Sequence, residues 1–345
     1  MDLSVVIVTW NGRPLLERFL PSVLATDYPA LEVVVADNAS EDGTAAWLAE
    51  TYPDVVVVRH AENGLFAKGN NDAVPSASGD VLCFLNNDVE VPPGWLTPLV
   101  AALDDPEVVA VQPKLLQHGD RTRFEYAGAS GGFLDAFGYP FTRGRIFDAL
   151  EPDIGQYDDA RDVFWATGAA LVVRREAFES AGGFDESFGM HMEEIDLCWR
   201  LQLAGFRIRS VPSSVVYHYG GWSLKSESFR KAYLNHRNQL AMLLKNLSLL
   251  RLAWVLPLRI LLTLGTLPLG VIKQDWKQPA AFLGGLAWIC VRPLHIIERR
   301  AEAQRARRIS DKILATRMHP GSIALQYFLR GKKTATELLQ TGPGG

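Results

Sequence analysis

Residues 3–38 read LSVVIVTWNGRPLLERFLPSVLATDYPALEVVVADN, and this stretch decides the fold class. Leu3 to Thr9 is a short run of β-branched apolar residues, which is typical of a strand buried on both faces. Residues 16–24 then place apolar side chains at helical spacing. Residues 31–36 (LEVVVA) repeat the strand pattern. The stretch therefore predicts a strand, a helix and a second strand.

The same alternation continues outward to about residue 111. Further apolar runs at 55–58, 81–85 and 108–111 predict strands, and turn residues followed by helical spacing separate them. Strands that alternate with helices indicate an α/β fold with a Rossmann-like, mostly parallel sheet and helices on both faces. Ligands of such sheets bind outside the carboxyl ends of the strands.

Polar residues gather at those predicted strand ends. They are Thr9, Trp10, Asn11, Asp37, Asn38, Asn86, Asn87 and Asp88. Asp88 could ligate Mg2+ or Mn2+, which prefer oxygen ligands and often keep substrate phosphates in their shell. Asp37 could accept hydrogen bonds from a nucleoside. The alternative for both residues is a carboxylate that caps a turn or a helix.

Two further motifs carry candidate chemistry. The segment NGLFAKGN at 63–70 could bind phosphate through its backbone amides and Lys68, although it is neither a Walker motif nor a dinucleotide fingerprint. In GMHMEEIDLCWR at 189–200, Glu193, Glu194 and Asp196 crowd three carboxylates into four residues. Their repulsion should raise the pKa of at least one, which suits a general base, unless the cluster only opens a helix.

The charge is divided unequally along the chain. Residues 1–225 hold 16 Lys and Arg against 33 Asp and Glu, a balance of −17, whereas residues 226–345 hold 19 against 6, a balance of +13. The basic part could bind nucleic acid or an anionic membrane, and its apolar content favours the membrane. We therefore predict no nucleic-acid partner.

The cellular compartment is predicted from the lack of paired cysteines and the lack of a signal-peptide pattern. The three cysteines form no C-x-x-C pair, so neither a disulfide framework nor a thiolate zinc site is expected, which suggests a reducing compartment. No signal-peptide pattern precedes the first strand. We expect the protein at the cytoplasmic face of the cell membrane.

Two apolar stretches follow a predicted helix at 234–252. Residues 254–272 include Pro257, Arg259 and Pro268, and residues 279–291 are too short to span a bilayer. Their bordering Lys, Arg and Trp residues favour helices that lie in the membrane plane or re-enter it, over two clean spans. A buried helical hairpin, which could form a homodimer interface, is the alternative. The basic cluster at 299–308 suits anionic lipid or a solvated helix face.

Taken together, the motifs resemble those of a bacterial family 2 glycosyltransferase of GT-A fold, closest to its rhamnosyltransferase-like branch. They occur in the family's order over residues 3 to about 245: SVVIVTWNG, VVVADNASEDGT, NGLFAKGNN, FLNNDV, TGAALVVRREAF, GGFDESF…EEIDLCWRLQLAGF and HYGGWS. The resemblance implies a nucleotide-sugar-binding half at 1–110 and an acceptor-binding, catalytic half at 111–228. Residues 229–345 would form a basic, apolar, membrane-associated helical region.

The resemblance also implies roles for single residues in an inverting, cation-dependent transfer. Thr9, Asn11, Asp37 and Asn38 would hold the nucleoside, with Lys68 and Asn70 near the donor. Asp88 matches the last carboxylate of the family's metal motif, while Asn86 replaces the first, and His218 would be a second metal ligand. Glu194 would be the base, beside Glu193 and Asp196. Arg200 would brace that helix or contact phosphate, and Trp10 and Asn87 complete the predicted donor site.

Several readings remain open at this point. A sugar-phosphate nucleotidyltransferase would have the same kind of nucleotide-binding sheet. Such enzymes normally carry a basic, glycine-rich loop directly after the first strand, and this chain lacks it. A catalytically inactive scaffold that binds a nucleotide sugar at the membrane is the other alternative. The resemblance implies a dTDP- or UDP-sugar donor, with rhamnose as the first choice of sugar. The acceptor would be a lipid-linked or cell-surface saccharide.

Overall fold

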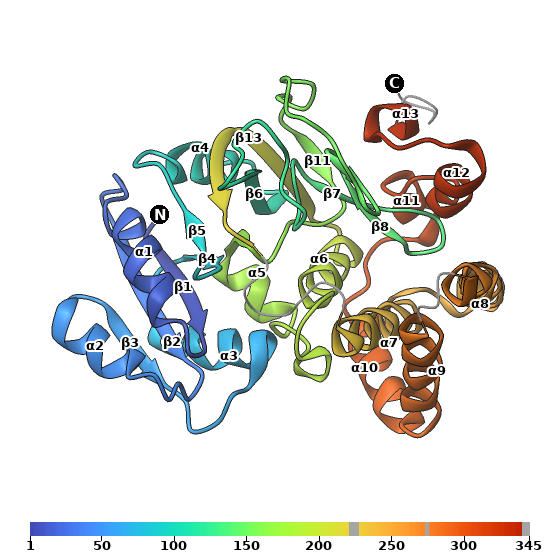
Figure 1. The fold of residues 1–345 in the computed structure, drawn as a ribbon, viewed down its shortest axis with the longest axis horizontal. Coiled ribbons are helices and arrows are strands. Elements are labelled where there is room, and N and C mark those ends of the chain that lie inside the picture. The colour runs from blue at the N-terminus through green and yellow to red at the C-terminus, as the bar shows by residue number, and fades with distance from the viewer. Residues whose placement is uncertain (221–227, 273–275, 340–345) are drawn as a thin grey trace.

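The computed structural model describes residues 1–220, 228–272 and 276–339, with side chains omitted at 266–272. Its first half confirms the predicted alternation of strands and helices (Figure 1). Strands β1, β2, β3 and β4 pair side by side in parallel, in the order β3-β2-β1-β4. The elements are β1 (Leu3–Thr9), α1 (Arg13–Leu24), β2 (Leu31–Asp37), α2 (Thr44–Thr51), β3 (Val56–Arg59), α3 (Leu65–Ala73) and β4 (Val81–Leu85).

Beyond β4 the sheet is mixed, so the predicted mostly parallel sheet is wrong for this half. The nine-stranded sheet has the order β11-β13-β6-β12-β4-β1-β2-β3, with β5 beside β13. Strand β12 runs antiparallel to both of its neighbours, β4 and β6. The added strands are β5 (Val89–Glu90), β6 (Val108–Gln117), β11 (Arg161–Val163), β12 (Ala170–Arg174) and β13 (Arg207–His218).

A second sheet of four strands lies within residues 112–160, where the sequence predicts no element. Its strands are β7 (Gly132–Leu134), β8 (Pro140–Thr142), β9 (Arg145–Ile146) and β10 (Ala149–Leu150). They lie side by side in this order, and each is antiparallel to its neighbour. Strands of two or three residues are too short to display a period of two, which explains why the pattern gave no signal.

Both faces of the large sheet are buried, as the apolar strands predict. On β1, Val5 and Ile7 pack in one core with Leu16 and Leu20 of α1. Val6 packs in the other core, which also holds residues of α3 and α6 (Glu193–Leu203). Two more helices, α4 (Leu96–Ala102) and α5 (Arg175–Ser180), complete the cover. A rigid, doubly covered sheet thus carries the loops at its carboxyl edge.

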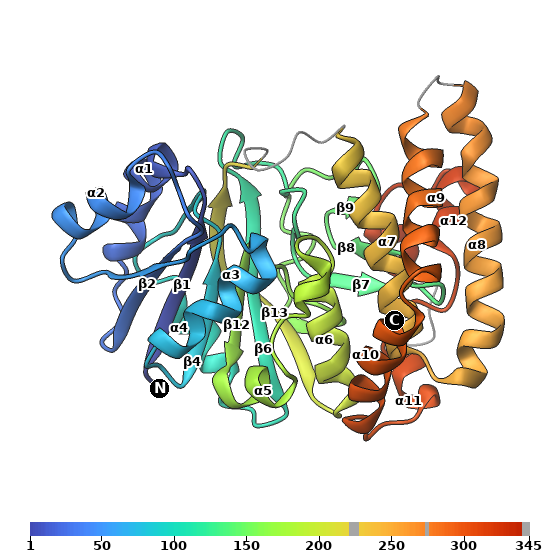
Figure 2. The same ribbon diagram turned by 90° about the horizontal axis from the view of Figure 1, so that it is seen from below.

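The C-terminal part is helical and packs on the sheet domain (Figure 2). Lys245 on α7 donates to Asp185 at 2.6 Å and to Asp196 of α6 at 2.8 Å, so buried ion pairs join the two parts. The helices are α7 (Phe229–Asn246), α8 (Leu249–Ile272), α9 (Lys277–Cys290), α10 (Pro293–Arg305), α11 (Asp311–Thr316), α12 (Ile323–Arg330) and α13 (Ala335–Leu339).

The helix predicted at 234–252 is divided between α7 and α8. Leu247 has extended backbone angles, and the Ser248 hydroxyl caps α8 by accepting from the Arg251 N–H at 3.2 Å. Within the described ranges, no single helix has the length and apolar character needed to cross a bilayer; α9 and α10 meet those criteria only as a pair bent by 80°.

Candidate functional site

The carboxyl ends of β1, β2 and β4 meet at one edge of the sheet. Thr9 and Asp37 are direct register partners, and the Asn38 N–H donates to the Thr9 carbonyl at 2.9 Å. From the loop after β4, Asn87 Nδ2 donates to Thr9 Oγ1 at 2.9 Å. Residues predicted from three separate strand ends therefore share one edge, as the parallel pairing requires.

Some of the predicted nucleoside-binding residues make hydrogen bonds that stabilise the turn after β2. Asp37 Oδ1 accepts from the Ser40 N–H at 3.0 Å, and Asn11 Oδ1 accepts from the Glu41 N–H at 2.8 Å. Asn38 donates to the Leu65 carbonyl at 2.9 Å. These bonds stabilise the loops, so Asn11 and Asn38 shape this edge, while the indole of Trp10 is 55% exposed beside it.

The predicted phosphate segment forms α3. Lys68 is partly exposed and forms an ion pair with Asp72 at 2.8 Å, one turn further along the helix. Asn70 is 1% exposed and donates to the Phe66 carbonyl at 2.9 Å. Asn70 therefore packs inside the fold, and the structure gives no support to the predicted contact between this side chain and a donor.

A buried cluster of charges joins the loop after β4 to the end of β13 and to the segment between β6 and β7. His218 Nε2 lies 3.0 Å from Asp88 Oδ1, and His218 Nδ1 lies 3.2 Å from Glu125 Oε2. Burial disfavours charge on the ring, but the two carboxylates raise the pKa of His218 to about 10. Burial likewise opposes charge on Asp88, yet His218 and the Gly220 N–H hold the pKa of that carboxyl below its ordinary value.

The predicted pair of metal ligands has the geometry of two adjacent ligands. Donor atoms about 2.1 Å from an octahedral cation are about 3.0 Å apart, which matches Asp88 Oδ1 and His218 Nε2. Asn86 Nδ2 adds a polar neighbour at 3.3 Å from the same ring nitrogen. Over the described ranges, however, no group of three His, Cys, Asp or Glu residues is arranged to hold a metal. A cation bound by these two residues would have to take its other ligands from substrate and water.

Glu125 was missed at the sequence level. It lies in the region of short strands and reaches His218 across 93 positions of the chain. A lone carboxylate without a surrounding motif offers no signal that could have identified it.

The acidic start of α6 supplies two unusual carboxyls. Glu193 Oε2 and Glu194 Oε2 are both buried and have no hydrogen-bond partner among the residues that the structure describes. Burial raises the pKa of Glu194 to about 7, against the effect of nearby backbone N–H groups. Burial, and then the charge of Glu194, raise the pKa of Glu193 well above its ordinary value. The predicted repulsion is present, but desolvation is the larger cause.

Asp196 and Arg200, predicted at the catalytic and donor sites, take part in a buried network of ion pairs and hydrogen bonds. Asp196 is fully buried and accepts from Arg200, Lys245 and Asn246, each at 2.8 Å. Arg200 also donates to the carbonyls of Ala181 and Gly183. These contacts brace α6 against α7, the first of the two roles that the sequence left open for Arg200.

A series of neighbouring contacts connects the strand ends to the acidic start of α6. The Asn86 N–H donates to the Ala169 carbonyl at 3.0 Å, and a side chain on neighbouring Gly168 would touch Glu194 and Phe66. Phe66 follows Leu65, whose carbonyl binds Asn38 beside Thr9. Asp37, Asp88 and Glu194 therefore border one region. It is the edge of the sheet at which β13 ends, uppermost in Figure 2.

Gly12 is required at this edge because a Cβ there would lie 2.2 Å from Thr9 Oγ1 and 2.6 Å from Asn87 Nδ2. We predict that Gly12→Ala lowers the free energy of unfolding by about 1–3 kcal/mol, since the Thr9–Asn87 pair must open. Denaturant titration measures this change. Gly94→Ala is the matched control because nothing lies within 4 Å of a Cβ at that position. Equal losses in both variants would contradict the steric account.

Comparisons with known proteins identify the family of the chain. Residues 4–180 match the family described as glycosyl transferase family 2. An O-antigen biosynthesis protein of Myxococcus xanthus is 35% identical over 66% of this chain, which spans only 18% of that protein. The N-acetylglucosaminyl-diphospho-decaprenol L-rhamnosyltransferase of Mycobacterium tuberculosis is 33% identical over 68% of this chain and 82% of its own length.

Among solved structures, GalNAc-T7 crystallised with UDP, GalNAc and Mn2+ superposes with a TM-score of 0.57. The match has 20% identity and covers 70% of this chain and 47% of that one. At this identity the likeness speaks for the fold alone, and it supports the GT-A-like α/β architecture.

Proposed function

The chain belongs to glycosyl transferase family 2, and from that premise we propose that it transfers a sugar, with inversion, from a nucleotide-diphosphate donor to an acceptor hydroxyl. One observation carries the proposal: Asp37, Asp88 and Glu194 border a single region at the carboxyl edge of the sheet. A nucleoside, a diphosphate and a proton acceptor must meet at such a place for the reaction to occur.

In the proposed mechanism Asp37 and Trp10 orient the nucleoside, and the edge holds the donor for in-line attack. The acceptor oxygen forms a bond to the anomeric carbon, and the bond from that carbon to the diphosphate oxygen breaks. Glu194 takes the acceptor proton, and the nucleoside diphosphate leaves with the bonding electron pair. The raised pKa of Glu194 suits it to this task, since a base with a pKa near the working pH transfers protons efficiently.

We further propose that Asp88 and His218 hold Mg2+ or Mn2+ together with diphosphate oxygens. When bound, such an ion neutralises charge that develops on the leaving diphosphate. The 3.0 Å separation of the two donor atoms supports this assignment. The imidazole must release its proton before it ligates, so the cation replaces a proton in this cluster.

The pH dependence of the reaction follows from Glu194. Its carboxyl is protonated below its pKa of about 7 and cannot act as a base there. We expect kcat/KM to rise about tenfold per pH unit up to pH 7 and then to level off. Steady-state rates from pH 5 to 9 test this, with donor affinity measured over the same range as the control. A midpoint near the ordinary value for Glu, or a flat profile, would remove Glu194 from the role of base.

For the donor we propose a dTDP- or UDP-sugar, with rhamnose as the transferred sugar, because the similar Mycobacterium tuberculosis enzyme is an L-rhamnosyltransferase. For the acceptor we propose a lipid-linked or cell-surface saccharide, since that relative acts on N-acetylglucosaminyl-diphospho-decaprenol. The place of action would be the cytoplasmic face of the cell membrane. The excess of positive charge over residues 226–345 and the apolar helices there support this location.

A thermal-shift screen of UDP-, dTDP- and GDP-sugars with and without Mn2+ would identify the donor, because a ligand of the folded state raises its stability. Release of nucleoside diphosphate with a membrane extract then tests transfer. A donor that binds but is never turned over would favour an inactive scaffold. Release of pyrophosphate from a nucleoside triphosphate and a sugar phosphate would instead indicate a nucleotidyltransferase.

A further inference from the structure

Helix α8 has its polar side inward and its apolar side outward. Arg251, Val255, Arg259 and Thr263 recur every four residues and are all buried. Over residues 249–265, whose side chains the structure describes, the exposed side carries no charged residue. It consists of Leu249, Leu250, Ala253, Trp254, Pro257, Leu258, Leu261, Leu264 and Gly265. A helix on a water-exposed surface shows the opposite arrangement.

The exposed side is extensive and lies at the outer edge of the molecule (Figures 1 and 2). Leu250 is 85% exposed, and Leu261, about three turns further on, is 62% exposed. Scattered exposed leucines need no explanation, but a continuous apolar row marks a surface that contacts something other than water.

Of the two buried arginines of α8, Arg259 has the closer partners, although its Nε, like that of Arg251, has no hydrogen-bond partner in the described part of the chain. It donates to the Phe137 carbonyl at 3.0 Å and to Gln239, and its guanidinium stacks 3.3 Å from the centre of the Tyr139 ring. These contacts anchor the middle of α8 on the sheet domain.

Arg251 is 9% exposed and poorly paired. Its guanidinium donates only to the Asp311 carbonyl at 3.3 Å and to Met318 Sδ at 3.7 Å, and its Nε has no partner. No ion pair joins Arg251 to a carboxylate of the described part of the chain. The nearby Asp311 carboxylate is bound by Arg307 and Ser248 instead. The Asp311 carboxylate favours the charged form of Arg251 electrostatically but makes no direct ion pair with it. An anion from outside would supply the direct partner that the buried guanidinium lacks.

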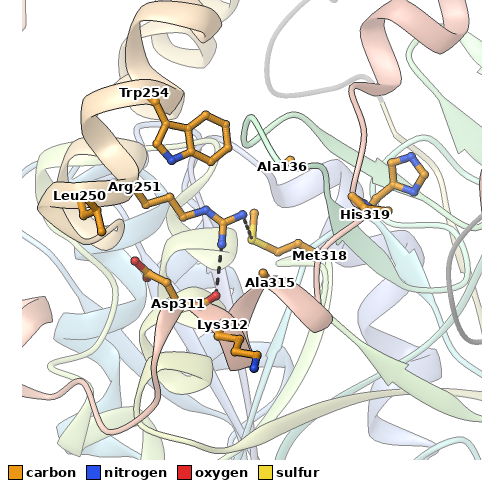
Figure 3. Close-up of a pocket in the computed structure, with 10 residues that line it drawn as sticks. Ala136, Leu250, Arg251, Trp254, Asp311, Lys312, Ala315, Met318 and His319 are labelled. Carbon is orange, nitrogen blue, oxygen red and sulfur yellow. Dashed lines mark hydrogen bonds between the residues drawn. The ribbon is translucent and has the colours of Figure 1, made fainter.

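Arg251 lines a cavity of about 420 Å³ at the start of α8. Figure 3 shows its guanidinium between Trp254 and Met318, with α11 opposite. Leu250 and Trp254 form an apolar wall that continues into the exposed row of α8, and Lys312 brings a second, exposed cation. The cavity thus places a guanidinium group, which can bind a phosphate, next to an apolar surface.

We propose that α8 lies in the headgroup layer of an anionic membrane and that the Arg251 cavity binds the phosphate of a lipid. A guanidinium matches phosphate oxygens in pairs, and Lys312 adds charge at the entrance. The acyl or prenyl chain of the lipid would lie along Leu250 and Trp254. This inference rests on the proposed attachment to a membrane, and it assigns the attachment to one helix and one cavity.

A second copy of the chain is a less fitting occupant. A symmetric dimer through α8 would place the same patch on both sides of the interface. It would cover the leucines, but it would bring a second Arg251 rather than an anion. The cavity therefore favours a lipid over a second copy.

Co-sedimentation of the full chain with vesicles tests the proposal. We expect binding to phosphatidylcholine vesicles that contain phosphatidic acid, and weaker binding to phosphatidylcholine alone. Leu250→Glu should weaken binding at least about tenfold, because it removes an inserted leucine and adds a charge. Ile154→Glu is the matched control, since Ile154 is 81% exposed on the sheet domain and its replacement should leave binding unchanged.

Two variants examine the cavity itself. Arg251→Gln should remove most of the preference for phosphatidic acid, and exposed Lys312→Gln should reduce it about fivefold without affecting folding. Preserved preference in both variants would overturn the phosphate site. Stabilisation of the wild type by inorganic phosphate, without binding to any vesicle, would identify a soluble ligand and overturn the lipid assignment. A wild-type dimer that Leu250→Glu converts to a monomer would assign α8 to a second copy.

The same variants are assayed for transfer to a soluble saccharide acceptor. Leu250→Glu lies far from Glu194 and should turn over this acceptor normally. Normal turnover by a wild type that binds no vesicle would refute the membrane site and leave the transfer reaction standing. Vesicle binding without turnover of any acceptor would support the membrane site and refute the proposed transfer reaction.

Discussion

Glu194→Gln is expected to lower kcat by about two to four orders of magnitude, which is the usual contribution of a general base. The amide keeps the shape of the side chain but cannot take the acceptor proton. Donor affinity should stay within a few-fold, because Glu194 acts on the acceptor. Single-turnover rates and calorimetric donor titration measure the two effects separately.

Asp196 on the same helix provides the contrast. It is paired with Arg200 and Lys245, so Asp196→Asn should cost about 3 kcal/mol of stability while the molecules that stay folded turn over normally. Loss of donor binding in Glu194→Gln, or equal loss of turnover in both variants, would show that Glu194 is not the base.

Asp88→Asn is expected to weaken donor binding in the presence of Mn2+ by about a hundredfold or more, since a cation contributes several kcal/mol at such a site. The variant removes one of two proposed ligands and leaves His218 beside Glu125. Donor titration with and without Mn2+ measures the loss. We expect Mn2+ to enhance donor binding by the wild type and to have little effect on the variant.

Asp80→Asn is the matched control, because Asp80 is exposed at the amino end of the same strand, β4, and should not affect the metal. Treatment with EDTA should reduce wild-type transfer to the level of Asp88→Asn. Full wild-type activity in EDTA would remove the cation from the mechanism and leave Asp88 as a partner of His218.

The location of the site at one edge of the sheet was predictable because it follows from local patterns. Buried strands are continuous apolar runs, and the chain leaves each parallel strand at the same edge. Thr9, Asp37 and Asp88 therefore had to lie near one another once their strands were recognised. The acidic start of α6 could be read in the same way, because three carboxylates within four residues are visible without any structure.

What the sequence determined by itself is thus the parallel half of the fold, its family and the edge at which we propose the site, since each depends on residues close together in the chain. Contacts between distant segments were decided only by the tertiary structure. They include Glu125 against His218, the buried ion pairs of Asp196, and the inward turn of Asn70. The sequence likewise showed an arginine within an apolar run, but only packing against the sheet domain determined that α8 turns its arginines inward and its leucines outward.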